Sequence, residues 1–331
     1  MTTNSAGVGA DLGRLRGLAA WAARVQRQDP PEAFRHVRAI LVDTPGTVAD
    51  RTATDDGSDD VAAASPEELT LSLLAERAGV SRRIVDVVTG VAALDEPATA
   101  AAQRGPILVE ELSGEQLEAA YELGRYIADE EADSGTDLLL VGAGGATRDE
   151  DMVAATALVA ALLGREPLPL VGTDTATGNV LGLDDRAWAR RVAGVRDVLR
   201  RTRGGSPAGP MELLRTVGGP RIAVLTGLLQ QAAERRTPTL LDGTVSCAAA
   251  LAADQLAPES RQWWLAAATP AEPAGRAALA DLELPPLLDL GIRAGTGAAA
   301  LIAVPIVGAA VELARAAGVP DQADNAGDRP A

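Results

Sequence analysis

Short apolar runs alternate with longer helical segments along most of the chain. The apolar runs show little polar alternation, which is typical of strands that are covered on both faces of a sheet. They predict strands over residues 39–43, 84–88, 138–141, 168–171, 222–225 and 239–241. The segments between them predict helices over residues 66–78, 114–131, 149–163, 184–202 and 245–256. This alternation indicates an α/β fold with a doubly wound, mainly parallel and Rossmann-like sheet.

Charge and composition exclude several classes of function. The chain has a formal net charge of −16, which repels phosphate backbones and argues against nucleic-acid binding. Its single cysteine, Cys247, excludes an internal disulfide, and its single histidine, His36, is too little for a histidine-based metal cluster. We therefore expect a cytoplasmic protein with no bound metal and no nucleic-acid partner.

No segment has the pattern of a membrane span. The longest apolar stretch, over residues 298–311, contains Pro305 and Gly308 and is short for a bilayer, so we expect a buried helix there. Residues 1–10 lack a basic region followed by an apolar core, which argues against a signal peptide. No membrane partner is expected.

Three stretches contain the residues that suggest chemistry. They read DLLLVGAGGATRDE over residues 137–150, LLDGTVSCAAALAA over 240–253 and LLDLGIRAGTGA over 287–298. A glycine-rich turn between a strand and a helix directs backbone N–H groups and a helix dipole at an anion. The turn in the first stretch is therefore a candidate phosphate site.

The turn over residues 142–147 also allows two other interpretations. Thr147 and Glu150 match a capping box, in which the helix satisfies its own first N–H groups and leaves none for phosphate. Gly142 and Gly144 match the beginning of a dinucleotide-binding fingerprint, but its third glycine would fall at Thr147. The sequence leaves the phosphate and capping interpretations open.

In this order the three stretches resemble the nicotinate-nucleotide–dimethylbenzimidazole phosphoribosyltransferase family. The segments VGTDT over residues 171–175, WARRV over 188–192 and VGGPRIAVLTG over 217–227 fit the same family. The resemblance implies transfer of phosphoribose from nicotinate mononucleotide to a benzimidazole-type aromatic base, a step in assembling the lower-ligand nucleotide of cobalamin. It implies no metal or organic cofactor. We expect a homodimer or a pairing with a related subunit.

The resemblance also implies a set of phosphate- and nucleotide-binding residues. Arg191 replaces what is usually a lysine in the family and keeps the charge. Asp242 and Gly243 have an alternative role as a structural turn after a strand. We expect the turns over residues 142–147 and 172–175 to share a pocket at the carboxyl ends of parallel strands. The full set is Gly142, Gly144, Gly145, Thr147, Gly172, Thr175, Arg191, Asp242, Gly243, Gly295, Thr296 and Gly297.

The chain departs from the family at the catalytic position. The family motif RLGEGTG becomes RAGTG over residues 293–297, so two residues are missing and Ala294 stands where the family has a glutamate as general base. Alanine accepts no proton, and losing a general base costs about 10²–10⁴-fold in rate. No catalytic residue is therefore assigned, and weak or absent turnover is expected. Glu272 and Glu283 lie upstream as candidate substitutes.

These losses leave three functions open. We adopt a phosphoribosyltransferase of the family type. The alternatives are a non-catalytic binding or regulatory paralogue, which would pair with an active subunit, and an enzyme whose acceptor ionises without the glutamate. The resemblance implies an α/β domain over residues 37–290, and a small helical domain from residues 1–36 with the glycine-rich loop and helix over 291–318. Residues 319–331 are expected to form a disordered tail.

Overall fold

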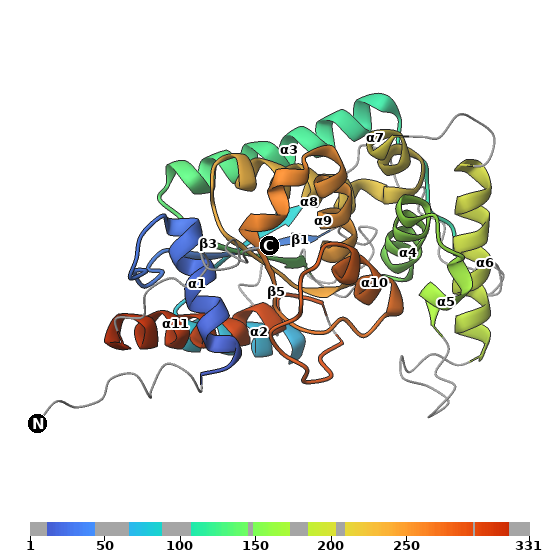
Figure 1. The fold of residues 1–331 in the computed structure, drawn as a ribbon. Coiled ribbons are helices and arrows are strands. Elements are labelled where there is room, and N and C mark those ends of the chain that lie inside the picture. The colour runs from blue at the N-terminus through green and yellow to red at the C-terminus, as the bar shows by residue number, and fades with distance from the viewer. Residues whose placement is uncertain are drawn as a thin grey trace, which may run out of the picture.

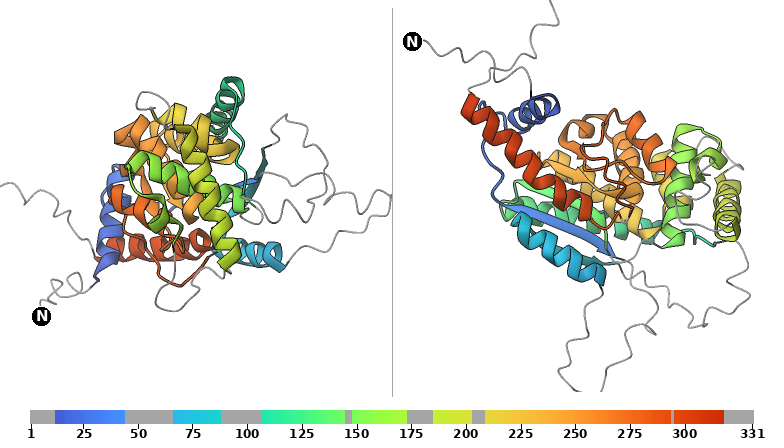
Figure 2. Two further views of the ribbon diagram at one scale, coloured as in Figure 1. Left: turned by 90° about the vertical axis from the view of Figure 1, so that its right-hand side faces the viewer. Right: turned by 90° about the horizontal axis from the view of Figure 1, so that it is seen from below.

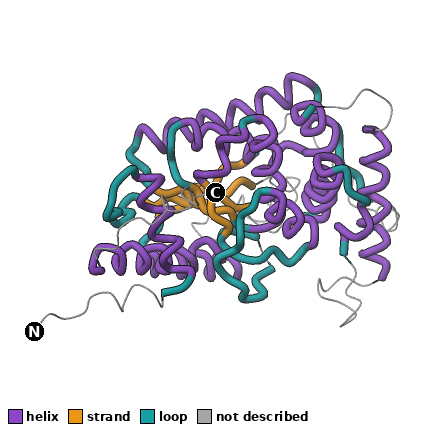
Figure 3. The backbone as a smooth tube through the Cα atoms, in the orientation of Figure 1, coloured by secondary structure: helices purple, strands orange, loops and turns teal. Residues whose placement is uncertain are grey.

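The computed structural model describes residues 12–43, 66–87, 107–144, 148–172, 185–202, 209–293 and 295–317 of the 331-residue chain. These described residues contain one sheet of five parallel strands, which Figure 3 shows at the centre of a shell of helices. The strands are β1 (Val37–Asp43), β2 (Ser81–Asp86), β3 (Leu138–Ala143), β4 (Thr239–Leu241) and β5 (Trp264–Ala266), in the spatial order β2-β1-β3-β4-β5. The predicted α/β fold with a parallel sheet is confirmed.

Helices cover both faces of this sheet (Figures 1 and 2). The helices are α1 (Arg14–Gln26), α2 (Pro66–Ala78), α3 (Gly114–Asp133), α4 (Asp149–Leu163), α5 (Pro167–Val171), α6 (Asp185–Arg201), α7 (Pro210–Leu213), α8 (Gly219–Glu234), α9 (Gly243–Leu256), α10 (Pro273–Asp281) and α11 (Ala298–Ala317). One face carries α8 and α9, with α3 packed outside α8, and the other carries α2 and α11. The chain crosses from β1 to β2 in one direction and from β3 to β4 and β5 in the other, so right-handed connections place helices on both faces.

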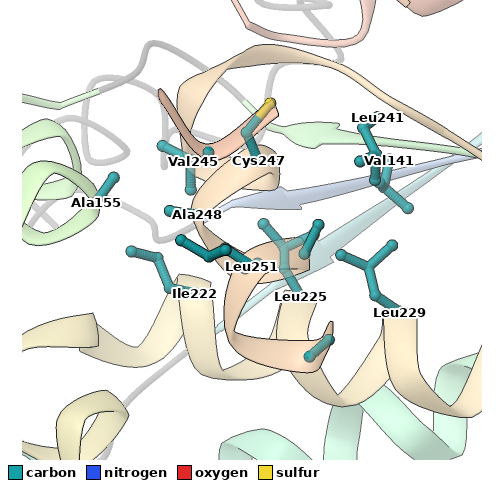
Figure 4. Close-up of a cluster of buried hydrophobic side chains, with 14 of the residues drawn as sticks. Val141, Ala155, Ile222, Leu225, Leu229, Leu241, Val245, Cys247, Ala248 and Leu251 are labelled. Atoms are coloured by element: carbon teal, nitrogen blue, oxygen red, sulfur yellow. The ribbon is translucent and has the colours of Figure 1, made fainter. Parts of the chain in front are cut away.

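The core between the sheet, α8 and α9 is filled by aliphatic side chains, because only 2% of the residues are aromatic. Figure 4 shows Leu225 and Leu229 of α8 beside Leu251 of α9, with Val141 and Leu241 reaching them from the strands. All five side chains are at most 1% exposed. Because these side chains are not aromatic and are therefore smaller, the sheet, α8 and α9 can approach one another closely.

Glycine allows the closest of these approaches, where α3 crosses α8. A β-carbon on Gly227 would lie 2.0 Å from the backbone oxygen of Tyr121, and one on Gly124 would lie 1.9 Å from that of Val224. Real β-carbons do not approach so closely, so the two helix backbones touch at this crossing and only glycine fits.

Two of the predicted strands are wrong, because both segments are helical. Residues 168–171 belong to α5, and residues 222–225 lie in α8, which is covered by α3 on one side and by α9 on the other. A short apolar run looks the same in a buried strand and in a helix that is buried all round, so periodicity does not separate them. Proline does: Pro167 and Pro220 stand in the first turns of α5 and α8, where a fixed φ favours a helix start.

The other predicted elements are close to the observed ones. The helices over residues 66–78 and 149–163 match α2 and α4, and the other three differ by at most two residues at either end. The strand over residues 84–88 lies at 81–86 instead, and the three-residue strand β5 was not predicted.

The predicted buried helix over residues 298–311 is the first part of α11. Among the described helices, α11 alone is long and apolar enough to cross a membrane by length and composition. It packs against α1, α2 and β3, and Leu301, Val307 and Val311 on its inner face are buried. The packing of α1 on α11 brings the two ends of the described chain together, while the predicted division into domains stays a prediction.

Candidate functional site

A cavity of about 300 Å³ lies at the carboxyl ends of β4 and β5, the edge where open α/β sheets bind ligands. Its wall comes from the turn after β4, the loop between β5 and α10, the loop before α11, and one residue each from α4 and α6. The lining residues are Met152, Arg191, Asp242, Gly243, Thr244, Val245, Ala268, Thr269, Pro270, Ala271, Glu272, Ile292, Arg293 and Gly295. Four of the twelve predicted binding residues therefore face this cavity: Arg191, Asp242, Gly243 and Gly295.

Three other predicted residues stand behind the cavity wall. A β-carbon on Gly142 would lie 2.8 Å from the backbone nitrogen of Gly297, so the end of β3 and the loop before α11 pass each other in contact. The N–H of Ala143 donates to the carbonyl of Gly295 at 3.1 Å and fastens the same loop to β3. Thr296 is 1% exposed. In this structure Gly142, Thr296 and Gly297 shape the wall from behind and do not line the cavity.

Asp242 connects the end of β4 to the start of α11. Its Oδ2 accepts hydrogen bonds from the backbone N–H groups of Ala299 at 3.0 Å and Ala300 at 3.3 Å, which would otherwise be unsatisfied at the helix start. Burial raises the pKa of Asp242 to about 6, and hydrogen bonds from backbone N–H groups act against this rise. The carboxylate of Asp242 is therefore a structural cap at the floor of the cavity.

Arg191 supplies a cation at the cavity from α6. Its Nε and Nη2 donate to Oδ1 of Asp149 at 2.9 and 2.7 Å, and its side chain is 15% exposed. Asp149 is the first residue of α4, so the pair connects α4 to α6 at the cavity wall. A ligand phosphate at this place would share Arg191 with a carboxylate.

Glu272 is the second carboxylate of the cavity. It precedes the first residue of α10, but its side chain makes no capping hydrogen bond to that helix. The carboxylate instead accepts a hydrogen bond from the hydroxyl of Thr244 at 2.7 Å. Glu283, the other candidate base, lines a separate apolar hollow of about 410 Å³ on the far side of Thr269 and Pro270. The structure thus brings only one of the two candidate bases to the cavity.

The structure describes only part of the turn after β3, and its role as a phosphate site stays a prediction. The N–H of Gly144 donates to the carbonyl of Val42 at 2.7 Å, so this group is bonded within the sheet edge. The N-cap of α4 is Arg148, whose backbone N–H lies 3.4 Å from the carboxylate of Asp151, so the predicted capping box of Thr147 with Glu150 is displaced by one residue. Gly145, Thr147, Thr175 and Ala294 lie outside the described residues.

The prediction that the turns at Gly142 and Gly172 both follow strands is wrong. Whether the two turns share a pocket stays a prediction, since residues 145–147 and 173–175 lie outside the described residues. Gly142 lies at the carboxyl end of β3, but Gly172 follows the short helix α5 and ends no strand. Its carbonyl accepts a hydrogen bond from the indole N–H of Trp188 at 2.8 Å, which joins it to α6. The prediction failed because residues 168–171 were interpreted as a strand.

A buried cluster of charges was not predicted from the sequence. Arg221, which is 1% exposed, contacts Oδ1 of Asp43 through Nη2 at 3.0 Å and Oδ2 of Asp151 through Nη1 at 2.9 Å. Burial lowers the pKa of Arg221, against the effect of the two carboxylates, and burial raises the pKa of Asp151. The cluster occupies the carboxyl ends of β1 and β3, where the strand order reverses. The only sequence signal was an arginine within the apolar segment over residues 217–227.

The described part of the chain shows neither a metal site nor a reactive thiol. Its residues contain no group of three or more His, Cys, Asp or Glu side chains placed to hold a metal ion. Cys247 is buried within α9, and burial raises the pKa of its thiol well above the usual range. It is an inert core residue.

Three comparisons with known proteins agree. A family model described as Phosphoribosyltransferase matches residues 4–324. The nicotinate-nucleotide–dimethylbenzimidazole phosphoribosyltransferase of Mycobacterium marinum is 39% identical over 96% of this chain and 89% of its own length. That of Mycobacterium avium is 41% identical over 91% of this chain and 85% of its own. The crystal structure of CobT from Thermus thermophilus matches with a TM-score of 0.69 and 29% identity, and the match covers 92% of this chain and 90% of that chain.

Proposed function

Since the chain belongs to this phosphoribosyltransferase family, we propose that it transfers phosphoribose from nicotinate mononucleotide to a benzimidazole-type base. The reaction is a displacement at the anomeric carbon of the ribose: a ring nitrogen of the base attacks, and nicotinate leaves from the opposite side. The product is the nucleotide of the lower ligand of cobalamin. No metal or organic cofactor takes part.

The observation that carries this proposal is the cavity itself. This chain matches its relatives over nine tenths of its length. The carboxyl ends of β4 and β5 open into a space with the cations of Arg191 from α6 and Arg293 from the loop before α11, and with a carboxylate from the start of α10. A nucleotide substrate needs a cation for its phosphate, and a displacement by a ring N–H needs a proton acceptor.

Arg191 is the proposed phosphate ligand. It reaches the cavity wall from α6, and Asp149 fixes its guanidinium by two hydrogen bonds, so the cation is already oriented before a ligand arrives. A guanidinium held in one geometry loses little entropy on binding phosphate. The backbone of Gly243 and Gly295, which line the same cavity without side chains, leaves room for the sugar to lie against the wall. Positioning of this kind accounts for much of the acceleration in a displacement between two bound molecules.

We also propose a cytoplasmic location, a homodimer or a pairing with a related subunit, and a small helical domain that contains α1 and α11. The single, buried cysteine supports the location, since it suits a reducing compartment. The packing of α1 on α11 supports the domain. Light scattering of the purified protein measures the subunit number directly.

The test of the proposed function is a turnover assay. Purified protein is incubated with nicotinate mononucleotide and dimethylbenzimidazole, and nicotinate and the ribazole phosphate are separated and quantified. The proposal predicts that the two products appear in equal amounts and at a rate proportional to protein concentration. If nicotinate mononucleotide is neither bound nor consumed at millimolar concentration, the proposed function is wrong.

A further inference from the structure

Two carboxylates line the cavity among the residues that the structure describes, and they are engaged differently. Asp242 is 4% exposed, and its Oδ2 accepts two backbone N–H groups of α11. If Asp242 gave up these hydrogen bonds, backbone N–H groups at the start of α11 would have no acceptor. Glu272 caps no helix and accepts one hydrogen bond, at Oε2, from Thr244. Its second oxygen has no partner within the described part of the chain. Glu272 is therefore the carboxylate that can receive a proton from a ligand.

The position of Glu272 is not explained by helix capping. Short polar side chains are preferred before the first residue of a helix because their oxygens reach back to the N–H groups of the first turn. Glutamate is longer, and here it turns toward the hydroxyl of Thr244 across the cavity wall. Thr244 is 3% exposed and belongs to the first turn of α9, so it holds the carboxylate from a rigid, buried position. The hydrogen bond fixes one oxygen and leaves the other for the cavity.

Glu272 also lies close to the proposed phosphate ligand. Glu272, Arg191 and Met152 all line the main cavity, and the same three residues line a smaller hollow beside it. A nucleotide whose phosphate meets Arg191 therefore has its ribose and the incoming base in the same space as Glu272. Glu283 does not have this relationship, because it faces the neighbouring apolar hollow.

On the basis of the function proposed above, we infer that Glu272 is the general base of this chain, in place of the carboxylate that is absent at position 294. The lone pair of one ring nitrogen of the base forms the new bond to the anomeric carbon. The bond from that carbon to nicotinate breaks, and its electron pair leaves with nicotinate. The proton on the other ring nitrogen passes to the unoccupied oxygen of Glu272 and then to water. Thr244 is a positioning residue, since it acts through its hydrogen bond to Glu272.

The test compares Glu272→Gln with Glu283→Gln as its matched control. Steady-state rates with nicotinate mononucleotide and dimethylbenzimidazole are measured at neutral pH, after circular dichroism has shown that each variant is folded. Loss of a general base lowers kcat by about 10²-fold or more, while KM for nicotinate mononucleotide stays within a few-fold, because the phosphate contact is unchanged. Glu283→Gln should keep both kcat and KM within a few-fold of the wild type, because Glu283 faces the neighbouring hollow and not the cavity.

Two further variants separate catalysis from structure. Glu272→Asp keeps a carboxylate and should recover part of the lost kcat. Thr244→Val removes only the hydrogen bond to Glu272, so it should lower kcat by less than Glu272→Gln does and leave KM for nicotinate mononucleotide within a few-fold. A Glu272→Gln variant whose kcat matches that of the wild type would overturn the inference and leave the proposed function intact. A wild-type protein without turnover would overturn the proposed function, and the role of Glu272 with it.

Discussion

A β-carbon added to Gly243 would lie 2.5 Å from the Cα of Gly295, so the turn after β4 and the loop before α11 touch backbone to backbone. Both glycines line the cavity, and both have positive φ, +83° and +61°. No side chain separates the two segments. The shape of the cavity therefore depends on a contact between positions that are more than fifty residues apart in the sequence.

Gly243→Ala should destabilise the fold more than a glycine change that introduces only backbone strain. Gly291 provides that comparison, because its φ is +65° and a β-carbon there would meet open space. Gly291→Ala should lower the free energy of unfolding by about 1–2 kcal/mol. Gly243→Ala should lower it by a further 1–3 kcal/mol or so, because the methyl group has to displace Gly295. Urea denaturation of both variants measures the difference, and equal losses would show that the contact is looser than described.

Stability should depend on pH through Asp242. Its folded-state pKa of about 6 lies above the value of about 3.9 for an aspartate in an unfolded chain. Between these two values the folded protein holds a proton that the unfolded chain has released, so the free energy of unfolding decreases as the pH rises from about 4 to about 6. The total effect is at most about 3 kcal/mol.

The comparison with Asp242→Asn isolates this effect from other titrating groups. Asparagine does not titrate, so the wild-type minus variant difference in unfolding free energy should decrease by up to about 3 kcal/mol between about pH 4 and pH 7. Urea denaturation at several pH values gives this difference. If it stays constant or increases with pH, Asp242 does not titrate as its burial requires.

Arg221 should be far more important for stability than an arginine in a surface pair. Its replacement by alanine leaves the carboxylates of Asp43 and Asp151 without their shared cation, and breaking a buried pair in this way costs about 3–5 kcal/mol. Arg200 pairs with Asp197 on the exposed side of α6 and serves as the control. Arg200→Ala should change the free energy of unfolding by less than about 1 kcal/mol. Thermal and urea unfolding measure both variants. If Arg221→Ala and Arg200→Ala lowered the free energy of unfolding by similar amounts, the structural role of Arg221 would be refuted.

The sheet was predictable because its strands are buried on both faces. In β3 every residue is buried, so an uninterrupted apolar run was the expected signal. The same signal failed over residues 222–225, because α8 is buried between other helices and is just as apolar on every side. Pro167 and Pro220, in the first turns of α5 and α8, were the sequence signal that these apolar runs are helices and not strands.

The site was less predictable, because its contacts join distant segments. Arg221 and Asp43 are 178 positions apart, and no local pattern relates them. Gly142 and Gly297 were recognised as important glycines, but the sequence did not show that Gly142 makes room for the backbone of Gly297, or Gly297 for the side chain of Leu41. Glu272 and Glu283 were equivalent candidates in the sequence. Only the fold separates them, since the residues between α9 and α10 bring Glu272 to the cavity and α10 leads Glu283 away from it.

Binding of nicotinate mononucleotide, measured by calorimetry, tests the central claim most directly: the cavity recognises this nucleotide through a phosphate held by Arg191. The wild-type protein should bind nicotinate mononucleotide, and nicotinate alone should bind much more weakly. A charge-assisted contact contributes about 1.5–3 kcal/mol, so Arg191→Ala should weaken binding about ten- to a hundredfold. Arg200→Ala, which removes an exposed arginine from the same helix, should leave the affinity unchanged. No heat of binding at millimolar ligand, or equal affinities in the wild type and Arg191→Ala, would contradict the claim.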